Sequence, residues 1–249
     1  MLDPTALRTF ISFALILLAL AGLSRLISLR LQELVYLLTR SQDMPMVVLF
    51  LVLLPGVLLH ELAHWTMARL LGLRPGRFRV WPRKQGKYIG LGSVSVRRGG
   101  PLLDSLVGLA PLLTGSLLVT LIGLQVFDTP SLVEAWARNP WLDGPLAVLR
   151  SLDRPDGLLW AYLLFVVANA MVPSASDREP VKALLLYVLL AGLLYLLLDL
   201  PLRPLAASLA WLIPPLQILT SALLFVLVLD LFVLAGLLLL QGILARLVR

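Results

Sequence analysis

Two histidines and a glutamate stand close together in the sequence His60-Glu61-Leu62-Ala63-His64. On a helix, residues four positions apart lie on one face, so both imidazoles can reach the same metal ion. This HExxH pattern is typical of zinc sites, and the glutamate suits a general base that takes a proton from zinc-activated water. We therefore expect Zn²⁺ as the cofactor, His60 and His64 as ligands, and Glu61 as the catalytic residue.

The composition indicates a membrane protein. Apolar residues make up 59% of the 249 residues and charged residues 14%, and the mean hydropathy is +0.94. This balance excludes a disordered chain, and it leaves too little polar surface for a water-soluble globule. The net charge of +7 suits cytoplasmic loops, so we expect the lipid bilayer as a partner and no nucleic acid.

The predicted fold class is an all-α polytopic membrane protein with one domain over 1–249. Apolar runs near the ~20 residues that cross a bilayer predict about six transmembrane helices, at about 9–27, 44–68, 102–124, 158–175, 181–199 and 215–243. The stretch 74–98 is basic throughout, and the loop at about 125–157 carries both signs of charge. The positive-inside rule places 74–98 in the cytoplasm and 125–157 outside. Both termini are then cytoplasmic, and we expect a prokaryotic cell membrane.

A small β-hairpin is predicted at about 77–97, after the second span. Residues 77–81 and 93–97 both alternate between apolar and polar side chains, and Pro82 and several glycines separate them. Such alternation is typical of strands with one apolar face. The alternative is a basic connector in which the charge alone matters.

A hydrolytic zinc site uses three protein ligands and keeps one position open. The chain has no cysteine and no third histidine, so the remaining ligand must be a carboxylate, and the candidates at membrane depth are Asp104, Asp177, Asp199 and Asp230. His60 lies roughly 24 Å, and Asp177 roughly 28 Å, below the outer start of its own span. Asp199 falls at the opposite membrane face and Asp230 near the middle. Asp104 closely follows Arg97 and Arg98 and suits a cap or a salt-bridge partner at the start of the third span. Asp177 is therefore the predicted third ligand.

These motifs resemble the site-2 protease family of intramembrane zinc metalloproteases. The family's Asn-x-x-Pro-x-x-x-Leu-Asp-Gly type motif is similar to Asn169-Ala170-Met171-Val172-Pro173-Ser174-Ala175-Ser176-Asp177. The resemblance implies that Asp177 is the third zinc ligand. The proline stands one place late, and Ser176 and Arg178 replace the usual Leu and Gly, so we expect a divergent, minimal member without a PDZ or CBS domain. The resemblance covers roughly 44–182.

What the resemblance implies is hydrolysis of a peptide bond in a membrane-spanning protein substrate, in or near the bilayer. The basic hairpin resembles the family's membrane-associated β-segment, which is thought to pair with unwound substrate. Asn169 would bind the substrate carbonyl or the developing oxyanion. Its alternative role is a hydrogen bond between helices.

Two other functions remain open. One is a silent pseudoprotease or membrane scaffold, and the other is a transporter that uses Asp230 and the histidines as a proton relay. Two further classes of intramembrane protease are excluded. A serine protease needs a histidine on another helix, and both histidines are used. A presenilin-like protease needs Gly-x-Gly-Asp, whereas Gly90-Leu91-Gly92 is followed by Ser93.

Overall fold

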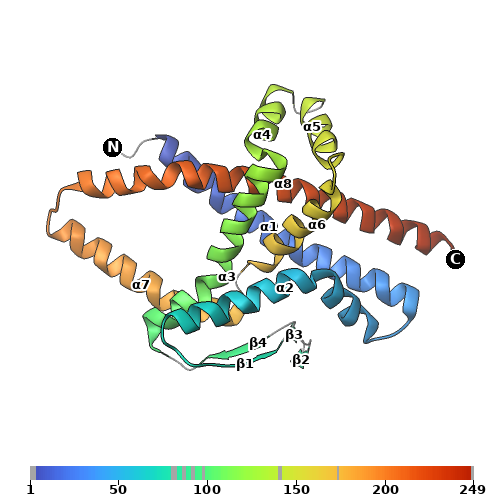
Figure 1. Cartoon of the computed structure of the whole chain (residues 1–249), viewed down its shortest axis with the longest axis horizontal. Coiled ribbons are helices and arrows are strands. Elements are labelled where there is room, and N and C mark those ends of the chain that lie inside the picture. The colour runs from blue at the N-terminus through green and yellow to red at the C-terminus, as the bar shows by residue number, and fades with distance from the viewer. Residues whose placement is uncertain are drawn as a thin grey trace.

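The computed structural model describes residues 4–79, 83–85, 88–90, 93–96, 99–139, 142–172 and 174–247. Its helices are α1 (Pro4–Thr39), α2 (Met44–Leu70), α3 (Pro101–Ile122), the π-helix η1 (Gly123–Phe127), α4 (Thr129–Arg138), α5 (Asp143–Leu152), α6 (Gly157–Ala170), α7 (Ala175–Leu197) and α8 (Leu202–Leu247) (Figure 1). Within the described ranges, five helical segments are long and apolar enough to cross a membrane, namely α1, α2, α3 with η1, α7 and α8. The prediction of an all-α, multi-pass membrane protein is therefore confirmed.

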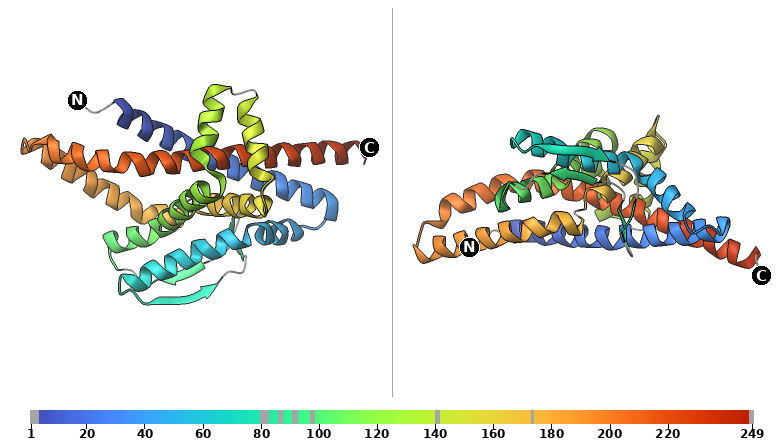
Figure 2. Two further views of the ribbon diagram at one scale, coloured as in Figure 1. Left: turned by 45° about the horizontal axis from the view of Figure 1, so that its top comes forward. Right: turned by 90° about the horizontal axis from the view of Figure 1, so that it is seen from below.

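The main core lies where α1, α3, α6 and α8 meet, and its fully buried members include Leu20, Val119, Leu164 and Val226. The two longest helices, α1 and α8, pack against each other and cross near their middles (Figures 1 and 2). In Figure 1, α3 stands across them and connects two ends of the molecule. One end holds α4 and α5, and the other holds α2 and the strands.

Four short strands follow α2. β1 (Pro75–Arg79) pairs antiparallel with β4 (Ser93–Val96), with Phe78 opposite Val94, and β2 (Arg83–Gln85) pairs antiparallel with β3 (Tyr88–Gly90). The predicted strands 77–81 and 93–97 overlap β1 and β4. Residues 80–82, 86–87, 91–92 and 97–98 lie outside the described residues.

Several helix boundaries differ from the predicted spans. α1 continues to Thr39, so most of the predicted first loop is helical, and α8 begins at Leu202 rather than near 215. α6 has 14 residues and ends at Ala170, which gives a rise of ~21 Å, less than a bilayer core of ~30 Å. The residue before a proline disfavours helical backbone, so Pro173 in the sequence is reason enough for a helix end here.

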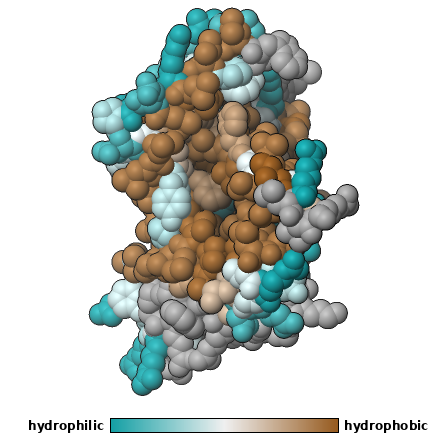
Figure 3. Space-filling model, turned by 90° about the vertical axis from the view of Figure 1, so that its right-hand side faces the viewer, coloured by the Kyte–Doolittle hydropathy of each residue, from teal (hydrophilic) through white to brown (hydrophobic). Residues whose placement is uncertain are grey.

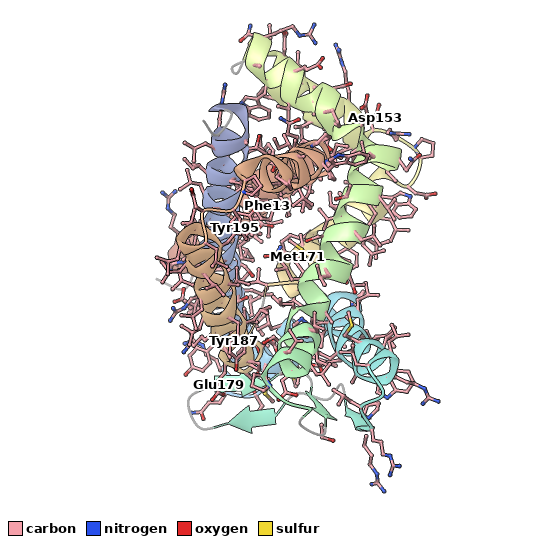
Figure 4. The ribbon with its side chains drawn as sticks, turned by 90° about the vertical axis from the view of Figure 1, so that its left-hand side faces the viewer. Phe13, Asp153, Met171, Glu179, Tyr187 and Tyr195 are labelled. Atoms are coloured by element: carbon pink, nitrogen blue, oxygen red, sulfur yellow. The ribbon has the colours of Figure 1, made fainter. Side chains whose placement is uncertain are left out.

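After residues 171–174, which we call the α6–α7 break, the chain resumes as α7. Asp177 consequently lies in the first turn of α7, whereas the predicted spans left it between the fourth and the fifth. Met171, within the break, is buried and contacts Gly115 of α3, where a Cβ atom would collide with its side chain (Figure 4). This contact fixes the break against α3.

The predicted external loop at 125–157 contains α4 and α5, which form a two-helix hairpin in which the Trp136 ring covers Gly144. The face of the molecule beside α6 is largely apolar and is hollowed near its middle (Figure 3). The hollow is a cavity of about 410 Å³ between α1, α2, α5, α6 and α8.

Candidate metal centre

The two histidines lie one turn apart on α2 and face the helices α3 and α6. Their rings meet edge to face, with centroids 4.7 Å apart and planes at 82°. Their side chains are only 14% and 11% exposed, and the His60 Nε2 and His64 Nε2 atoms lie 3.1 Å apart. Both Nε2 atoms therefore converge on one point in the interior.

Backbone carbonyls hold the opposite edge of each imidazole. The Nδ1 atom of His60 lies 2.7 Å from the Ala170 carbonyl oxygen, at the end of α6. The Nδ1 atom of His64 lies 2.8 Å from the Val107 carbonyl oxygen on α3. A carbonyl oxygen can only accept a hydrogen bond, so each Nδ1 carries the hydrogen. With the hydrogen on Nδ1, the Nε2 of an imidazole can offer its lone pair to a metal ion, which is the tautomer of a metal-binding histidine.

Asp177 completes the cluster from α7. Its Oδ2 atom is 3.5 Å from the His60 Nε2, and its Oδ1 atom is 3.3 Å from the His64 Nε2. A capping box aims the carboxylate: Oδ2 accepts a 2.8 Å hydrogen bond from the Ser174 backbone N–H, and the Ser174 hydroxyl accepts one of 3.4 Å from the Asp177 N–H. The carboxylate is thus fixed by the helix start on which it lies.

The spacing of these atoms is close to that of ligands around one metal ion. In a tetrahedron, two ligand atoms are separated by about 1.63 times the metal–ligand distance. Zinc–nitrogen and zinc–oxygen distances of about 2.0–2.2 Å give separations of about 3.3–3.6 Å. The two Nε2 atoms are 3.1 Å apart, slightly closer than this range, and each lies 3.3–3.5 Å from a different oxygen of the Asp177 carboxylate. His60, His64 and Asp177 therefore form a group that could hold a metal ion.

A glycine allows α7 to approach the histidines. A Cβ atom on Gly108 of α3 would lie 2.6 Å from the Asp177 carbonyl oxygen. Gly108 directly follows Val107, whose carbonyl holds His64. Residues Val107 and Gly108 of α3 thus position both His64 and Asp177. Val107 accepts a hydrogen bond from the His64 imidazole, and Gly108 leaves room for the Asp177 backbone.

Glu61 is buried on α2, with 7% of its surface exposed. It interacts electrostatically with His64, which places it in the neighbourhood of the cluster. A carboxylate in such surroundings can exchange a proton with a water molecule or a leaving group at the metal.

A cavity of about 610 Å³ leads to the cluster between α3 and α7. Its lining includes His64, Val107, Gly108, Asp177, Glu179 and Pro180. Glu179 lies at the same end of α7 as Asp177 (Figure 4). The side of the cluster formed by His64 and Asp177 therefore opens to this cavity, as a hydrolytic site requires.

The structure places Asn169 beside Asp230. The Asn169 side-chain amide donates hydrogen bonds to the Phe165 carbonyl oxygen, at 2.9 Å, and to Asp230 Oδ1 on α8, at 3.0 Å. Both amide hydrogens are thus engaged, one of them between helices. Asp104, in the first turn of α3, accepts a 2.8 Å hydrogen bond from the Gly99 N–H just before the helix, whereas the N-cap itself is Gly100 and has no side-chain cap.

Sequence reasoning did not find the groups that hold the ligands. The carbonyls of Ala170 and Val107 carry no sequence signal, because any residue supplies a carbonyl. The capping box, in contrast, has a sequence signal. Ser174-Ala175-Ser176-Asp177 precedes an apolar run, and this pattern is typical of a helix start. The bond between Asn169 and Asp230 joins residues 61 positions apart, and no local pattern indicates it.

Comparison with known proteins gives no relative of this chain: no family model, no curated protein and no solved structure matches it. The functional argument therefore depends on the cluster itself.

Proposed function

We propose that this protein is an intramembrane zinc metalloprotease of the site-2 protease type, which hydrolyses a peptide bond of a membrane-spanning substrate. The observation that carries this proposal is the cluster of His60, His64 and Asp177. The two Nε2 atoms lie 3.1 Å apart and within 3.5 Å of the Asp177 carboxylate, which is close enough for one zinc ion to bind all three side chains, and a backbone carbonyl lies within hydrogen-bond distance of the Nδ1 of each imidazole.

Each neighbouring residue has a defined task in this reaction. Zinc, when bound, supplies a Lewis acid for the scissile carbonyl and makes water easier to deprotonate. Glu61 accepts the proton of the attacking water and returns it to the leaving amine. Asn169 either releases an amide hydrogen to a substrate carbonyl or keeps α6 and α8 together. Because the transmembrane helix of a substrate hides its carbonyls, the substrate must unwind before it is attacked. The membrane-associated hairpin formed by β1 and β4 would hold it extended.

The length of α6 suits a six-segment topology with both termini in the cytoplasm. The site was predicted roughly 24 Å below the outer surface, and the 14 residues of α6 rise ~21 Å. α6 therefore needs only to reach the depth of the cluster, where the α6–α7 break turns the chain and α7 returns outward. The basic strands after α2 then lie on the cytoplasmic side of a prokaryotic cell membrane, near the cluster.

One purification tests this proposal. The protein is isolated in detergent, its zinc content is measured, and cleavage of transmembrane reporter substrates is compared between wild type and Glu61→Gln. We expect about one zinc per chain in both, with turnover in wild type only. Comparing the membrane proteins of cells that carry either form would identify the substrate.

The alternatives predict different results. Zinc without turnover of any reporter or membrane protein would indicate a silent site. Absence of stoichiometric zinc would overturn the protease and would favour a proton relay through the histidines and Asp230.

A further inference from the structure

The strongest feature outside the cluster is a buried carboxylic side chain on α8. Asp230 has no exposed surface and lies at the centre of an apolar helix. Its Oδ1 atom accepts the hydrogen bond from Asn169, while its Oδ2 atom has no partner among the described residues. A buried polar atom without a partner costs free energy. Packing alone would be better served by an apolar side chain at this position, so the retained carboxyl calls for a further explanation.

A short chain of contacts connects Asp230 to the candidate ligand His60. Asp230 Oδ1 accepts a 3.0 Å hydrogen bond from the Asn169 side-chain amide. Asn169 directly precedes Ala170, and the Ala170 carbonyl oxygen accepts a 2.7 Å hydrogen bond from the His60 Nδ1. Asn169 also donates to the Phe165 carbonyl, one turn earlier on α6. The final turn of α6 is thus tied to α8 at the residue before the carbonyl that orients His60.

The final turn of a helix needs such a tie. The last carbonyls of a helix have no partner within it, and helix ends fray unless other groups hold them. Ala170 is the last residue of α6, and the α6–α7 break follows directly. The bond from Asp230 to Asn169 adds a tie to α8 at this turn, and without it the Ala170 carbonyl that accepts from His60 is held less firmly.

We propose that Asp230 is a positioning residue of the metal centre, which acts through Asn169 and the Ala170 carbonyl on the metal affinity of His60. This inference rests on the proposed function, because it assumes that His60, His64 and Asp177 bind zinc. Asp230 itself touches neither the metal nor the substrate.

Two substitutions of Asp230 distinguish an effect on zinc affinity from an effect on folding. In Asp230→Asn, the side-chain oxygen still accepts from Asn169, so zinc affinity should stay within about twofold of wild type. In Asp230→Leu, the acceptor is lost and the unpartnered oxygen is removed as well. We expect zinc affinity to fall about 10- to 100-fold, the usual effect of removing a group that orients a metal ligand, while the thermal unfolding midpoint changes little.

The same helix offers a matched control. Ser221 is another buried polar residue of α8, and its hydroxyl lies 3.2 Å from the Thr129 hydroxyl of α4. Ser221→Ala removes a buried interhelical contact that has no connection to the histidines. It should leave zinc affinity unchanged, whatever its effect on stability.

Zinc affinity is measured by competition with a chromophoric chelator, and the visible absorption of the Co²⁺-substituted protein reports ligand geometry independently of activity. If wild type binds no zinc, the proposed function itself fails. If wild type binds zinc and folded Asp230→Leu binds it equally tightly, only the positioning role is overturned. Should Asp230→Leu not fold, the double variant Asn169→Leu/Asp230→Leu leaves no unpaired amide and takes its place. If that also fails to fold while Ser221→Ala folds, the pair is structural and the proposal is overturned.

Discussion

Gly56 and Ala170 touch where α2 crosses α6: a Cβ atom on Gly56 would lie 2.8 Å from the Ala170 Cβ and would collide with the Val166 carbonyl oxygen. Gly56 is one turn before His60 on α2, and Ala170 provides the carbonyl that holds His60. The closeness of the two helices and the orientation of a candidate ligand thus depend on the same contact.

Gly56→Ala should therefore weaken both the fold and metal binding. Forcing an extra methyl into a packed crossing typically costs about 1–3 kcal/mol, and moving α6 displaces the Ala170 carbonyl. Gly22→Ala on α1 is the control, because a Cβ there meets nothing within 4 Å, and alanine is favoured over glycine in a helix by roughly 0.8–1 kcal/mol. Thermal unfolding midpoints and zinc affinity are measured for both. Equal behaviour of the two variants would contradict the packing role.

Glu61→Gln should abolish proteolysis while the fold and the zinc content persist. Glutamine has the same shape but cannot accept the proton of the attacking water, and loss of a general base costs about 10²–10⁴ in rate. Turnover of a transmembrane reporter and zinc content are measured in parallel. Full activity of this variant would contradict the proposed role of Glu61 as general base.

Asp177→Ala should lower zinc content because it removes one of three ligands. This side chain also caps α7, so Ser174→Ala serves to separate the two roles: it loses a capping acceptor, worth about 0.5–2 kcal/mol, but keeps the carboxylate. Asp104→Ala removes a carboxylate that accepts from the Gly99 N–H at the start of α3 and is not a ligand. Both controls should retain zinc. A metal-bound structure with the Asp177 carboxylate more than about 4 Å from the ion would contradict the assignment, because ligating oxygens lie at about 2.0–2.2 Å.

Val94→Pro should reduce cleavage without reducing zinc content. Val94 lies in β4, opposite Phe78 of β1, and proline removes a backbone donor from the strand. The ligands are on α2 and α7, so metal binding should not change. Cleavage kinetics and zinc content are measured on the folded variant. Unchanged kinetics would indicate that this segment is a basic connector.

The sequence predicted which three side chains meet in the candidate site better than it predicted the helices that carry them. His60 and His64 could be paired because helical spacing is local, and Asp177 could be selected by counting residues through apolar runs. The count nevertheless assumed a continuous fourth span. The helix stops at Ala170, and Asp177 nevertheless meets the histidines because α7 starts close to the point where α6 ends. Apolar runs report where a chain can enter a membrane, and they say little about where a helix ends within it.

Contacts between distant residues were beyond the reach of the sequence. Asp230 had no identifiable partner in the sequence, and Asn169 had two competing interpretations. The structure joins them because α6 and α8 pack together, and helix packing depends on the shapes of whole faces rather than on any motif. The glycines at positions 56 and 108 are similar: their significance comes from the backbone that approaches them.

The α6–α7 break also has an electrostatic consequence. A helix carries partial negative charge at its last carbonyls and partial positive charge at its first N–H groups, so one interruption places opposite poles side by side. The negative pole of α6 faces the imidazole N–H of His60, and the positive pole of α7 carries the carboxylate of Asp177. Chain direction thus decides which kind of ligand suits each side. A carboxylate at position 60 would face the Ala170 carbonyl oxygen and be repelled by it. In an unbroken helix, the same carbonyl and N–H groups would form hydrogen bonds within the helix and could not hold the two ligands.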